Sequence, residues 1–225
     1  MCIRDRTKLQ CLAEDCDGQA IRDASKGTCV EIDIHDREEQ PLTRVQQAMN
    51  YHFEPEVLTS DYKWDCPKGC DHAEVSKTTN VTTAPVVLWI SLKRWSWSER
   101  QQEDICQWTH DVEPDANIQV FEKRYTLVSF VVHHGNSTRR GHYTACCRLE
   151  TPSESEWCHK DDDIVTAMAG PQDREVWKTQ GGDSKIYMLW YVQDDKLKKV
   201  IPDSMEVIPE DAKQNASSAL LKGKR

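Results

Sequence analysis

Four apolar segments that follow residue 84 restrict the fold more than any other feature of the sequence. Residues 85–92 form a short, almost uninterrupted apolar run, as in a strand that is buried on both faces. Residues 125–134 are rich in the valine and aromatic residues that strands favour, and residues 142–149 and 186–192 are predicted as a third and a fourth strand. The sequence therefore predicts a sheet built from these four strands.

Polar segments separate the predicted strands. Residues 135–141 have the composition of a turn, and residues 151–156 form an acidic turn. Residues 98–117 are polar and are predicted to be a loop, and residues 170–185 form a polar insertion before the last strand.

The first half of the chain is polar and is predicted to contain one helix. After Pro41, apolar residues recur at helical spacing, which predicts a helix over residues 41–53. We assign residues 7–83 to a first region and residues 84–194 to a second, strand-rich region. Residues 195–225 are rich in lysine and poor in apolar residues, so we expect a flexible tail. Residues 1–6 have the character of a truncated or non-native start.

Charge and cysteine content exclude several classes of protein. The formal net charge of the 225 residues is -9, which argues against a nucleic-acid surface. No run of 18 apolar residues exists that could span a membrane, and the start lacks the apolar core of a signal peptide. Ten cysteines without a secretory signal indicate a reducing compartment, so we expect a cytoplasmic and/or nuclear protein.

One histidine and one aspartate are spaced so that they can act together. His142 follows Gly141 in a predicted strand, and Asp161 lies nineteen residues later. Two antiparallel strands joined by the turn at 151–156 would bring Asp161 beside this strand. A histidine base that is oriented by a carboxylate activates Cys or Ser nucleophiles. A structural histidine and a solvated turn of aspartates are the alternative.

Five blocks of sequence around this pair resemble the ubiquitin-specific protease family. In chain order, the blocks are residues 85–95, 125–135, 141–145, 157–165 and 187–191. Together they extend over roughly residues 60 to 192, and their order makes the resemblance specific. The resemblance implies an α+β, papain-like cysteine protease fold with thumb, palm and fingers, in which palm and fingers are mostly antiparallel β-structure. Residues 7–83 would then be the fingers and residues 84–194 the palm.

The resemblance also implies roles for individual residues. His142 falls on the general base, Asp161 on the acid that orients it, and Asp162 on a neighbouring acid that assists the oxyanion. The residues that would contact substrate are His133, Gly141 and Tyr143. Lys160 departs from the family pattern, which usually has Phe there, so the packing behind Asp161 is in question.

The nucleophile that this pair requires is missing from the sequence pattern. In the family the catalytic cysteine lies in an N-terminal box at the start of a thumb helix, and nothing similar occurs here. Cys2 and Cys11 lack the Gly and Asn neighbours of an oxyanion hole, while Cys146 and Cys147 lie about 13–17 Å along the His142 strand. We therefore expect a chain without the thumb. It would be either the C-terminal part of a longer enzyme or a protein without the nucleophile, and it would hydrolyse nothing alone.

Two pairs of cysteines, about fifty residues apart, predict a structural zinc site. The four candidate ligands are Cys11, Cys16, Cys66 and Cys70. Four thiolates are a typical tetrahedral zinc site, and the fingers of the resembling family carry one at this place. Because the spacings are wider than C-x-x-C, reduced thiols without metal are the alternative. No cofactor is expected for catalysis.

The sequence leaves two functions open. The first is a deubiquitinase, which hydrolyses the isopeptide or peptide bond at the C-terminal glycine of ubiquitin and has ubiquitin or ubiquitinated proteins as partners. The second is a catalytically inactive ubiquitin-binding or scaffold protein with the same fold. A plain zinc-binding module would leave the blocks around His142 and Asp161 unexplained. Neither nucleic acid nor a membrane is expected as a partner.

Overall fold

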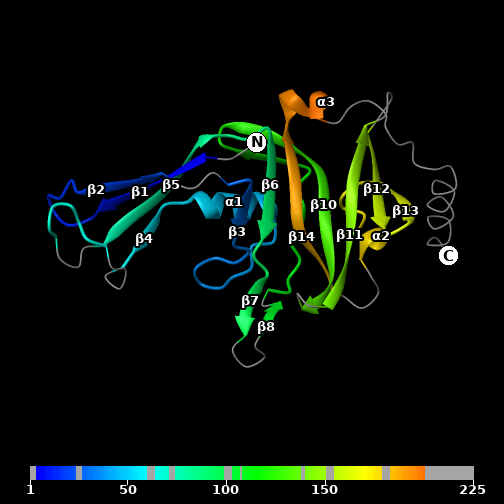
Figure 1. Ribbon diagram of the computed structural model, residues 1–225, viewed down its shortest axis with the longest axis horizontal. Helices are drawn as coiled ribbons and strands as arrows, with labels where there is room; N and C mark the ends of the chain where they lie inside the picture. Colours follow the sequence, from blue (N-terminus) through cyan, green and yellow to red (C-terminus); the bar gives the residue numbers. More distant parts are fainter. Residues whose placement is uncertain are drawn as a thin grey trace.

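The strands of the protein form one small and one large sheet (Figure 1). The structure is a computed structural model that describes residues 4–23, 27–59, 64–70, 74–98, 103–106, 108–137, 140–150, 155–178 and 183–200. No helix in these residues is long and apolar enough to cross a membrane.

The small sheet has four antiparallel strands in the order β2-β1-β5-β4. Its strands are β1 (Arg4–Cys11), β2 (Gln19–Asp23), β4 (Glu56–Leu58) and β5 (Val75–Thr83). Leu9, Cys11 and Val75 are buried on one of its faces. The residues 4–6 that the sequence suggested as a non-native start are the first residues of β1, and residues 1–3 lie outside the described residues.

The large sheet has ten strands, seven of which follow the order β13-β12-β11-β10-β14-β6-β3. The strands in this order are β3 (Cys29–Ile32), β6 (Val87–Leu92), β10 (Lys123–Ser137), β11 (Arg140–Glu150), β12 (Ser155–Asp161), β13 (Ile164–Met168) and β14 (Ser184–Gln193). The other three are β7 (Trp95–Ser98), β8 (Glu103–Cys106) and β9 (Asn117–Val120). Neighbouring strands run antiparallel except β3 and β6, which are parallel.

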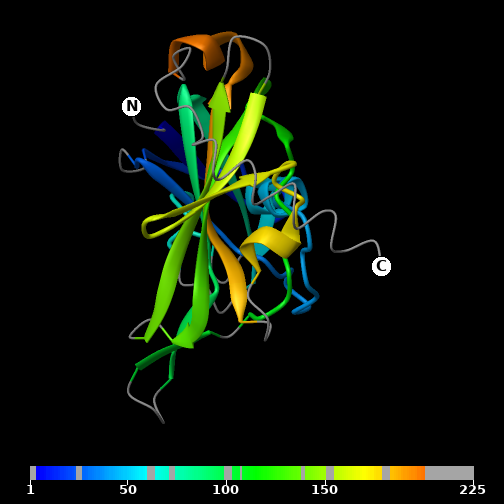
Figure 2. The ribbon, with the colours of Figure 1, turned by 90° about the vertical axis from the view of Figure 1, so that its right-hand side faces the viewer.

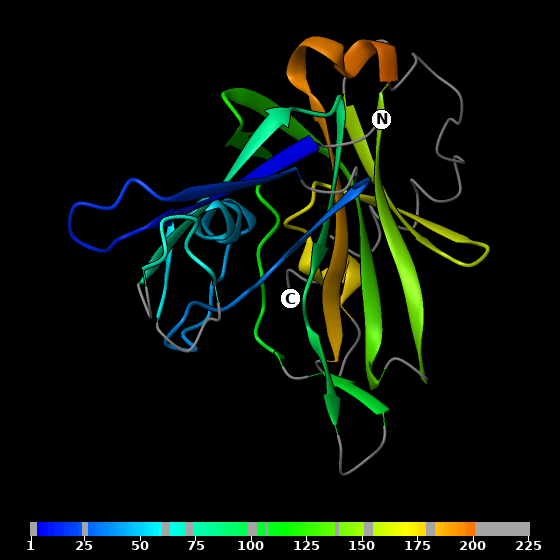
Figure 3. The same ribbon diagram turned by 60° about the vertical axis from the view of Figure 1, so that its left-hand side comes forward.

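One apolar core joins the large sheet to its helices. The helix α1 (Val45–Phe53) buries Val45, Ala48 and Met49 and contacts β3, β5 and β9. The short helix α2 (Arg174–Trp177) adds the ring of Trp177 to the same core. Figure 2 shows α1 and α2 on the same side of the large sheet, and Figure 3 shows α1 almost end-on beside the small sheet. Burial of one sheet face under these helices supplies the main apolar stabilisation of the fold.

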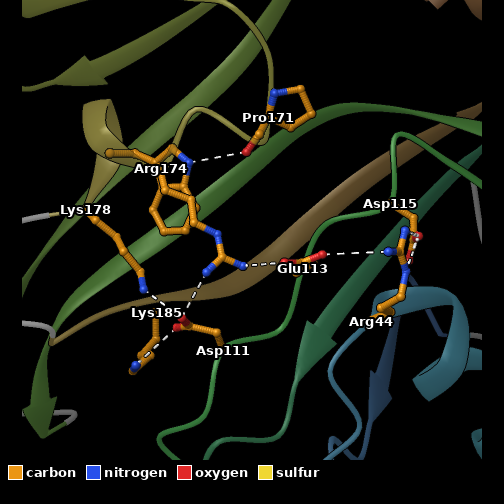
Figure 4. A network of polar contacts seen from close by, with 9 residues as sticks. Arg44, Asp111, Glu113, Asp115, Pro171, Arg174, Lys178 and Lys185 are labelled. Carbon is orange, nitrogen blue, oxygen red and sulfur yellow. Dashed lines mark hydrogen bonds and ion pairs between the residues drawn. The ribbon is translucent and has the colours of Figure 1, made fainter. Parts of the chain in front are cut away.

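Charged side chains connect these helices to the segment between β8 and β9 (Figure 4). Asp111 accepts hydrogen bonds from Arg174, Lys178 and Lys185, at 3.1, 2.7 and 3.3 Å. Lys185 belongs to β14, so this carboxylate ties α2 to the centre of the sheet.

The same segment is also tied to the start of α1. Arg44 pairs with Asp115 and lies 3.7 Å from Glu113, which in turn accepts a hydrogen bond from Arg174. The two helices are thereby held on either side of one irregular segment.

Three expectations from the sequence need correction. The helix begins at Val45 and not at residue 41, because the backbone of Leu42 bonds to Ile34 and Pro41 pairs with His35 in an extended conformation. The expected loop at 98–117 contains β8, since ladder hydrogen bonds form in polar segments too. The polar insertion at 170–185 contains α2, which the sequence pattern did not predict.

The last correction concerns the tail. Residues 194–200 are helical, as a 3-10 helix η1 (Asp194–Lys196) and α3 (Leu197–Val200). Residues 201–225 of the expected tail lie outside the described residues. The division into regions 7–83 and 84–194 stays a prediction; β3 and α1 of the first region pack in the core of the large sheet.

Candidate active site

The pairing of β11 with β12 brings His142 and Asp161 into contact. Lys160 lies opposite Ala145 in this antiparallel pair, so Asp161 and His142 are diagonal neighbours on one sheet face. The Nε2 atom of His142 and the Oδ1 atom of Asp161 are 2.5 Å apart, and the side chains are 46% and 42% exposed. The strand pairing and the contact expected from the spacing are both present.

Two backbone features place this pair at the end of its strands. Gly141 has φ +157, and a Cβ atom there would lie 2.2 Å from Nε2 of His133, so only glycine fits before His142. After Asp161, the chain turns through two residues into β13, and Asp162 has φ 49. Aspartate tolerates this left-handed conformation better than most residues do.

The contact changes the pKa of both groups. The hydrogen bond with Asp161 raises the pKa of His142, and Asp162 adds a smaller electrostatic contribution in the same direction. The same hydrogen bond lowers the pKa of Asp161. Because an ionised carboxylate can only accept, Nε2 of His142 carries the proton that is donated to Asp161. In the neutral ring, Nδ1 is then the atom that can take a proton.

A second histidine, His134, supports His142 from the neighbouring strand. It lies directly opposite His142 in the β10–β11 pair, and the two rings are stacked with centroids 5.9 Å apart. Its Nδ1 and Nε2 atoms each lie 2.8 Å from a hydroxyl oxygen, those of Ser184 and Thr144. Burial lowers the pKa of His134, so the ring is neutral near neutral pH. The sequence reasoning missed this residue, because only the strand register shows which histidine of the 133–134 doublet faces His142.

The three residues expected to contact substrate lie together on the face of the sheet opposite to His142, with His133 on β10 and the other two on β11. The ring of His133 is only 2% exposed and packs against Gly141, with Trp95 and Tyr143 at centroid distances of 5.1 and 4.7 Å. Tyr143 is 49% exposed. Their contact with a substrate stays a prediction.

The four cysteines expected as metal ligands meet at the end of the small sheet. Their sulfur atoms all lie within 4.8 Å of one another. Cys11 ends β1, Cys16 lies in the turn that follows, and Cys66 and Cys70 come from the segment 64–70. The Cys16 sulfur is 3.7 Å from that of Cys66 and 3.4 Å from that of Cys70. Tetrahedral zinc, with Zn–S bonds of about 2.3 Å, needs sulfurs about 3.8 Å apart.

The backbone around these sulfurs also suits thiolate ligands. The amides of Gly18 and Lys68 donate to the sulfurs of Cys16 and Cys66, at 3.3 and 3.4 Å. Burial opposes ionisation of Cys66, but the backbone amides of Lys68 and Cys70 lower the pKa of its thiol to about 7. Without a metal ion the hydrogen bond with Cys16 raises the pKa of Cys70 to about 12, so the four thiols do not all ionise readily. The residues present therefore fit a structural metal ion bound by four sulfurs.

A family model described as "Ubiquitin carboxyl-terminal hydrolase" matches residues 6–191 of the chain. Ubiquitin carboxyl-terminal hydrolase 9 of Saccharomyces cerevisiae is 27% identical over 191 residues, which are 82% of this chain and 24% of the yeast protein. Ubiquitin carboxyl-terminal hydrolase 12 of Salmo salar is 28% identical over 166 residues, 68% of this chain and 43% of that protein.

A human protein, ubiquitin carboxyl-terminal hydrolase 19, is 30% identical over 138 residues. These are 55% of this chain and 10% of the human protein. The chain thus spans less than half the length of each of these relatives.

Proposed function

Because this chain belongs to the ubiquitin carboxyl-terminal hydrolase family, as a ubiquitin-specific protease, we propose that it serves thiol-dependent hydrolysis at the C-terminal glycine of ubiquitin. The observation that carries the proposal is the contact between Nε2 of His142 and Oδ1 of Asp161. It leaves Nδ1 of His142 available as a general base. The substrate would be ubiquitin joined through an isopeptide or peptide bond.

In the proposed mechanism, His142 acts first as a general base and then as a general acid. Its Nδ1 atom takes the proton of a cysteine thiol, and the thiolate attacks the carbonyl carbon of the glycine. Asp161 holds the ring in the required tautomer and stabilises the imidazolium that forms. His142 then protonates the leaving amine, and water hydrolyses the thioester. The family resemblance also implies that Asp162 assists where negative charge develops on the carbonyl oxygen; an ionised carboxylate can do so only by orienting a hydrogen-bond donor.

The thiolate is proposed to come from outside the residues that the structure describes. Four of the described cysteines form the sulfur cluster. Burial raises the pKa of Cys146, and burial with the charge of Glu31 raises the pKa of Cys29 to about 11. Nucleophilic cysteines have lowered pKa values in partly exposed sites, so neither of these thiols fits the role. Cys147, and Cys158 opposite it, lie about 17 Å along the strand from His142, too far for a direct proton transfer. We therefore propose that residues 1–225 alone do not hydrolyse ubiquitin conjugates.

The sulfur cluster is proposed to hold zinc with a structural role. Cys11 belongs to the small sheet, whereas Cys66 and Cys70 belong to the segment between β4 and β5. An ion bound by all four sulfurs would close that segment onto the sheet. It would contribute no step to the hydrolysis.

Labelling and kinetics together test the proposed function. The isolated chain should remain unlabelled by ubiquitin that carries a C-terminal electrophile. In a protein that contains this chain together with a catalytic cysteine, His142→Ala should lower kcat/KM for a ubiquitin conjugate by about 100-fold or more. The control His52→Ala, on α1, should leave the rate unchanged. An unchanged rate in His142→Ala would contradict the assigned role.

A catalytically inactive ubiquitin-binding protein is the second candidate. The raised pKa values of Cys29 and Cys146 favour this second function, because neither thiol suits the role of a nucleophile. If every protein form that contains this chain binds ubiquitin but cleaves no conjugate, this second function replaces the first.

A further inference from the structure

Two cysteines face each other across the strands that carry His142 and Asp161. In the register of β11 and β12, Cys147 lies directly opposite Cys158. Directly opposed residues of an antiparallel pair have Cα atoms about 4.5 or 5.5 Å apart. Both separations fall within the range of about 4.4–6.8 Å that disulfides span. The register of the two strands therefore meets the Cα spacing that a disulfide requires.

The surroundings of the two thiols differ from those of the other cysteines. Cys158 is 0% exposed and forms a small apolar cluster with Cys147, Leu149, Val165 and Ala167, apart from the main core. Cys147 is only half-buried, so a small solute can reach it. Its sulfur also lies 3.5 Å from the hydroxyl oxygen of Ser129 on β10.

Neighbouring cysteines are placed for other roles. Cys146 is buried in the main core, and its partner across the strands is His159. The sulfurs that can hold a metal belong to residues 11–70, in and beside the small sheet. Both Cys147 and Cys158 are reduced in this structure.

We propose that Cys147 and Cys158 form a reversible oxidation site that closes to a cross-strand disulfide on reaction with hydrogen peroxide. The Cys147 thiolate attacks one peroxide oxygen, giving a sulfenic acid and, after protonation, one water. The Cys158 sulfur then attacks the Cys147 sulfur, and the hydroxyl group leaves as a second water. In total, two thiols and one hydrogen peroxide give one disulfide and two waters. A small dithiol reverses the reaction by exchange.

The bond would link the two strands of the candidate active site in the register they already have. Cys147 follows His142 by five residues on β11, and Cys158 precedes Asp161 by three residues on β12. The disulfide would close a short loop, so oxidation should preserve the contact between His142 and Asp161 and hold their strands together. This inference does not depend on the proposed hydrolytic function.

Peptide mapping of the full chain tests the site. After treatment with hydrogen peroxide and alkylation of the remaining thiols, trypsin should release residues 141–148 and 149–160 as one linked pair, because it cuts after Arg140, Arg148 and Lys160. Dithiothreitol should separate the pair. The oxidised chain should also unfold at a higher temperature than the reduced chain.

Three variants assign the link. Cys146→Ser should keep it, which excludes the adjacent thiol of the same peptide. Cys147→Ser should abolish it, and so should Cys158→Ser, in which a sulfenic acid on Cys147 should react with dimedone. If Cys158→Ser does not fold, Cys147→Ser, at a half-buried position, still tests whether the link requires Cys147. Full alkylation of both thiols in the peroxide-treated wild-type chain, or a link that is lost in Cys146→Ser, would overturn the proposal.

Discussion

The side chains of His142 and Asp161 are held by their neighbours rather than by burial. Both are nearly half exposed, so solvent weakens their mutual attraction. The ring of His134 stacks on that of His142, and Gly141 lets β11 begin directly beside His133. The geometry of the pair is thus built into the strands and does not depend on the charges themselves.

Asp161→Asn should lower the pKa of His142. The carboxylate of Asp161 favours the protonated ring of His142, so the pKa of His142 is raised in the folded wild-type protein. The ion pair therefore stabilises the fold at low pH, and this stabilisation is lost as the pH rises through the raised pKa. Histidine NMR signals followed against pH would measure the change.

The neighbouring aspartates provide graded controls for this experiment. Asp162→Asn should lower the pKa of His142 by less than Asp161→Asn does, since Asp162 acts only at a distance. Asp163→Asn, at an exposed position of the same turn, should have little effect. Equal shifts in all three variants would show that general charge, and not the hydrogen bond, sets the pKa.

At the level of single elements, the apolar segments of the sequence predicted the central strands well. Three of the four expected strands lie within β10, β11 and β14, since burial leaves a strong pattern in the sequence. The fourth, expected at 85–92, corresponds to β6, which begins two residues later, at Val87. β8 was missed because its pairing with β7 is made by backbone hydrogen bonds, which leave no apolar pattern in the side chains. The position of β3 was missed as well, because a parallel partner distant in sequence leaves no local signal.

The candidate site could be predicted only in part, because strand register cannot be read from the sequence. Residue types and spacing identified His142, Asp161 and the four cysteines, whose chemistry is specific. The support from His134, Ser184 and Thr144 depends on the register of three strands, which ordinary polar residues do not reveal.

The small sheet should depend on a metal ion held by the sulfur cluster. We expect one zinc per chain in metal analysis, and loss of hydrogen-exchange protection in β1 and β5 when a chelator removes it. Cys66→Ser should reproduce the effect of the chelator, whereas Cys29→Ser, outside the cluster, should not. A chain without zinc whose small sheet resists the chelator would refute this prediction.

At the level of the whole molecule, the buried guanidinium of Arg94 joins segments that are distant in sequence. The side chain is 1% exposed, and its Nε atom donates to the carbonyl of Ile186 at 2.7 Å. Its Nη1 atom donates to the carbonyls of Trp108 and His110 at 3.0 and 2.9 Å. One side chain thus fixes the segment before β9 against the start of β14.

Arg94→Met should lower the free energy of unfolding by about 3–5 kcal/mol, because three carbonyl groups lose a charged donor. Urea denaturation at constant pH would measure the loss. The adjacent Lys93→Met is a matched control. Lys93 forms an exposed ion pair with Asp33, so its replacement should cost about 0–1 kcal/mol. Similar losses in both variants would argue against the structural role of Arg94.

The two sheets are interleaved along the chain, and this restricts how the molecule can assemble or come apart. β1 and β2 enter the small sheet, β3 enters the large one, β4 and β5 return to the small sheet, and β6 resumes the large one. Neither sheet corresponds to one continuous stretch of sequence. A single proteolytic cut between β3 and β4 would therefore release neither sheet, and the small sheet cannot be completed during synthesis until β5 has emerged, after β3.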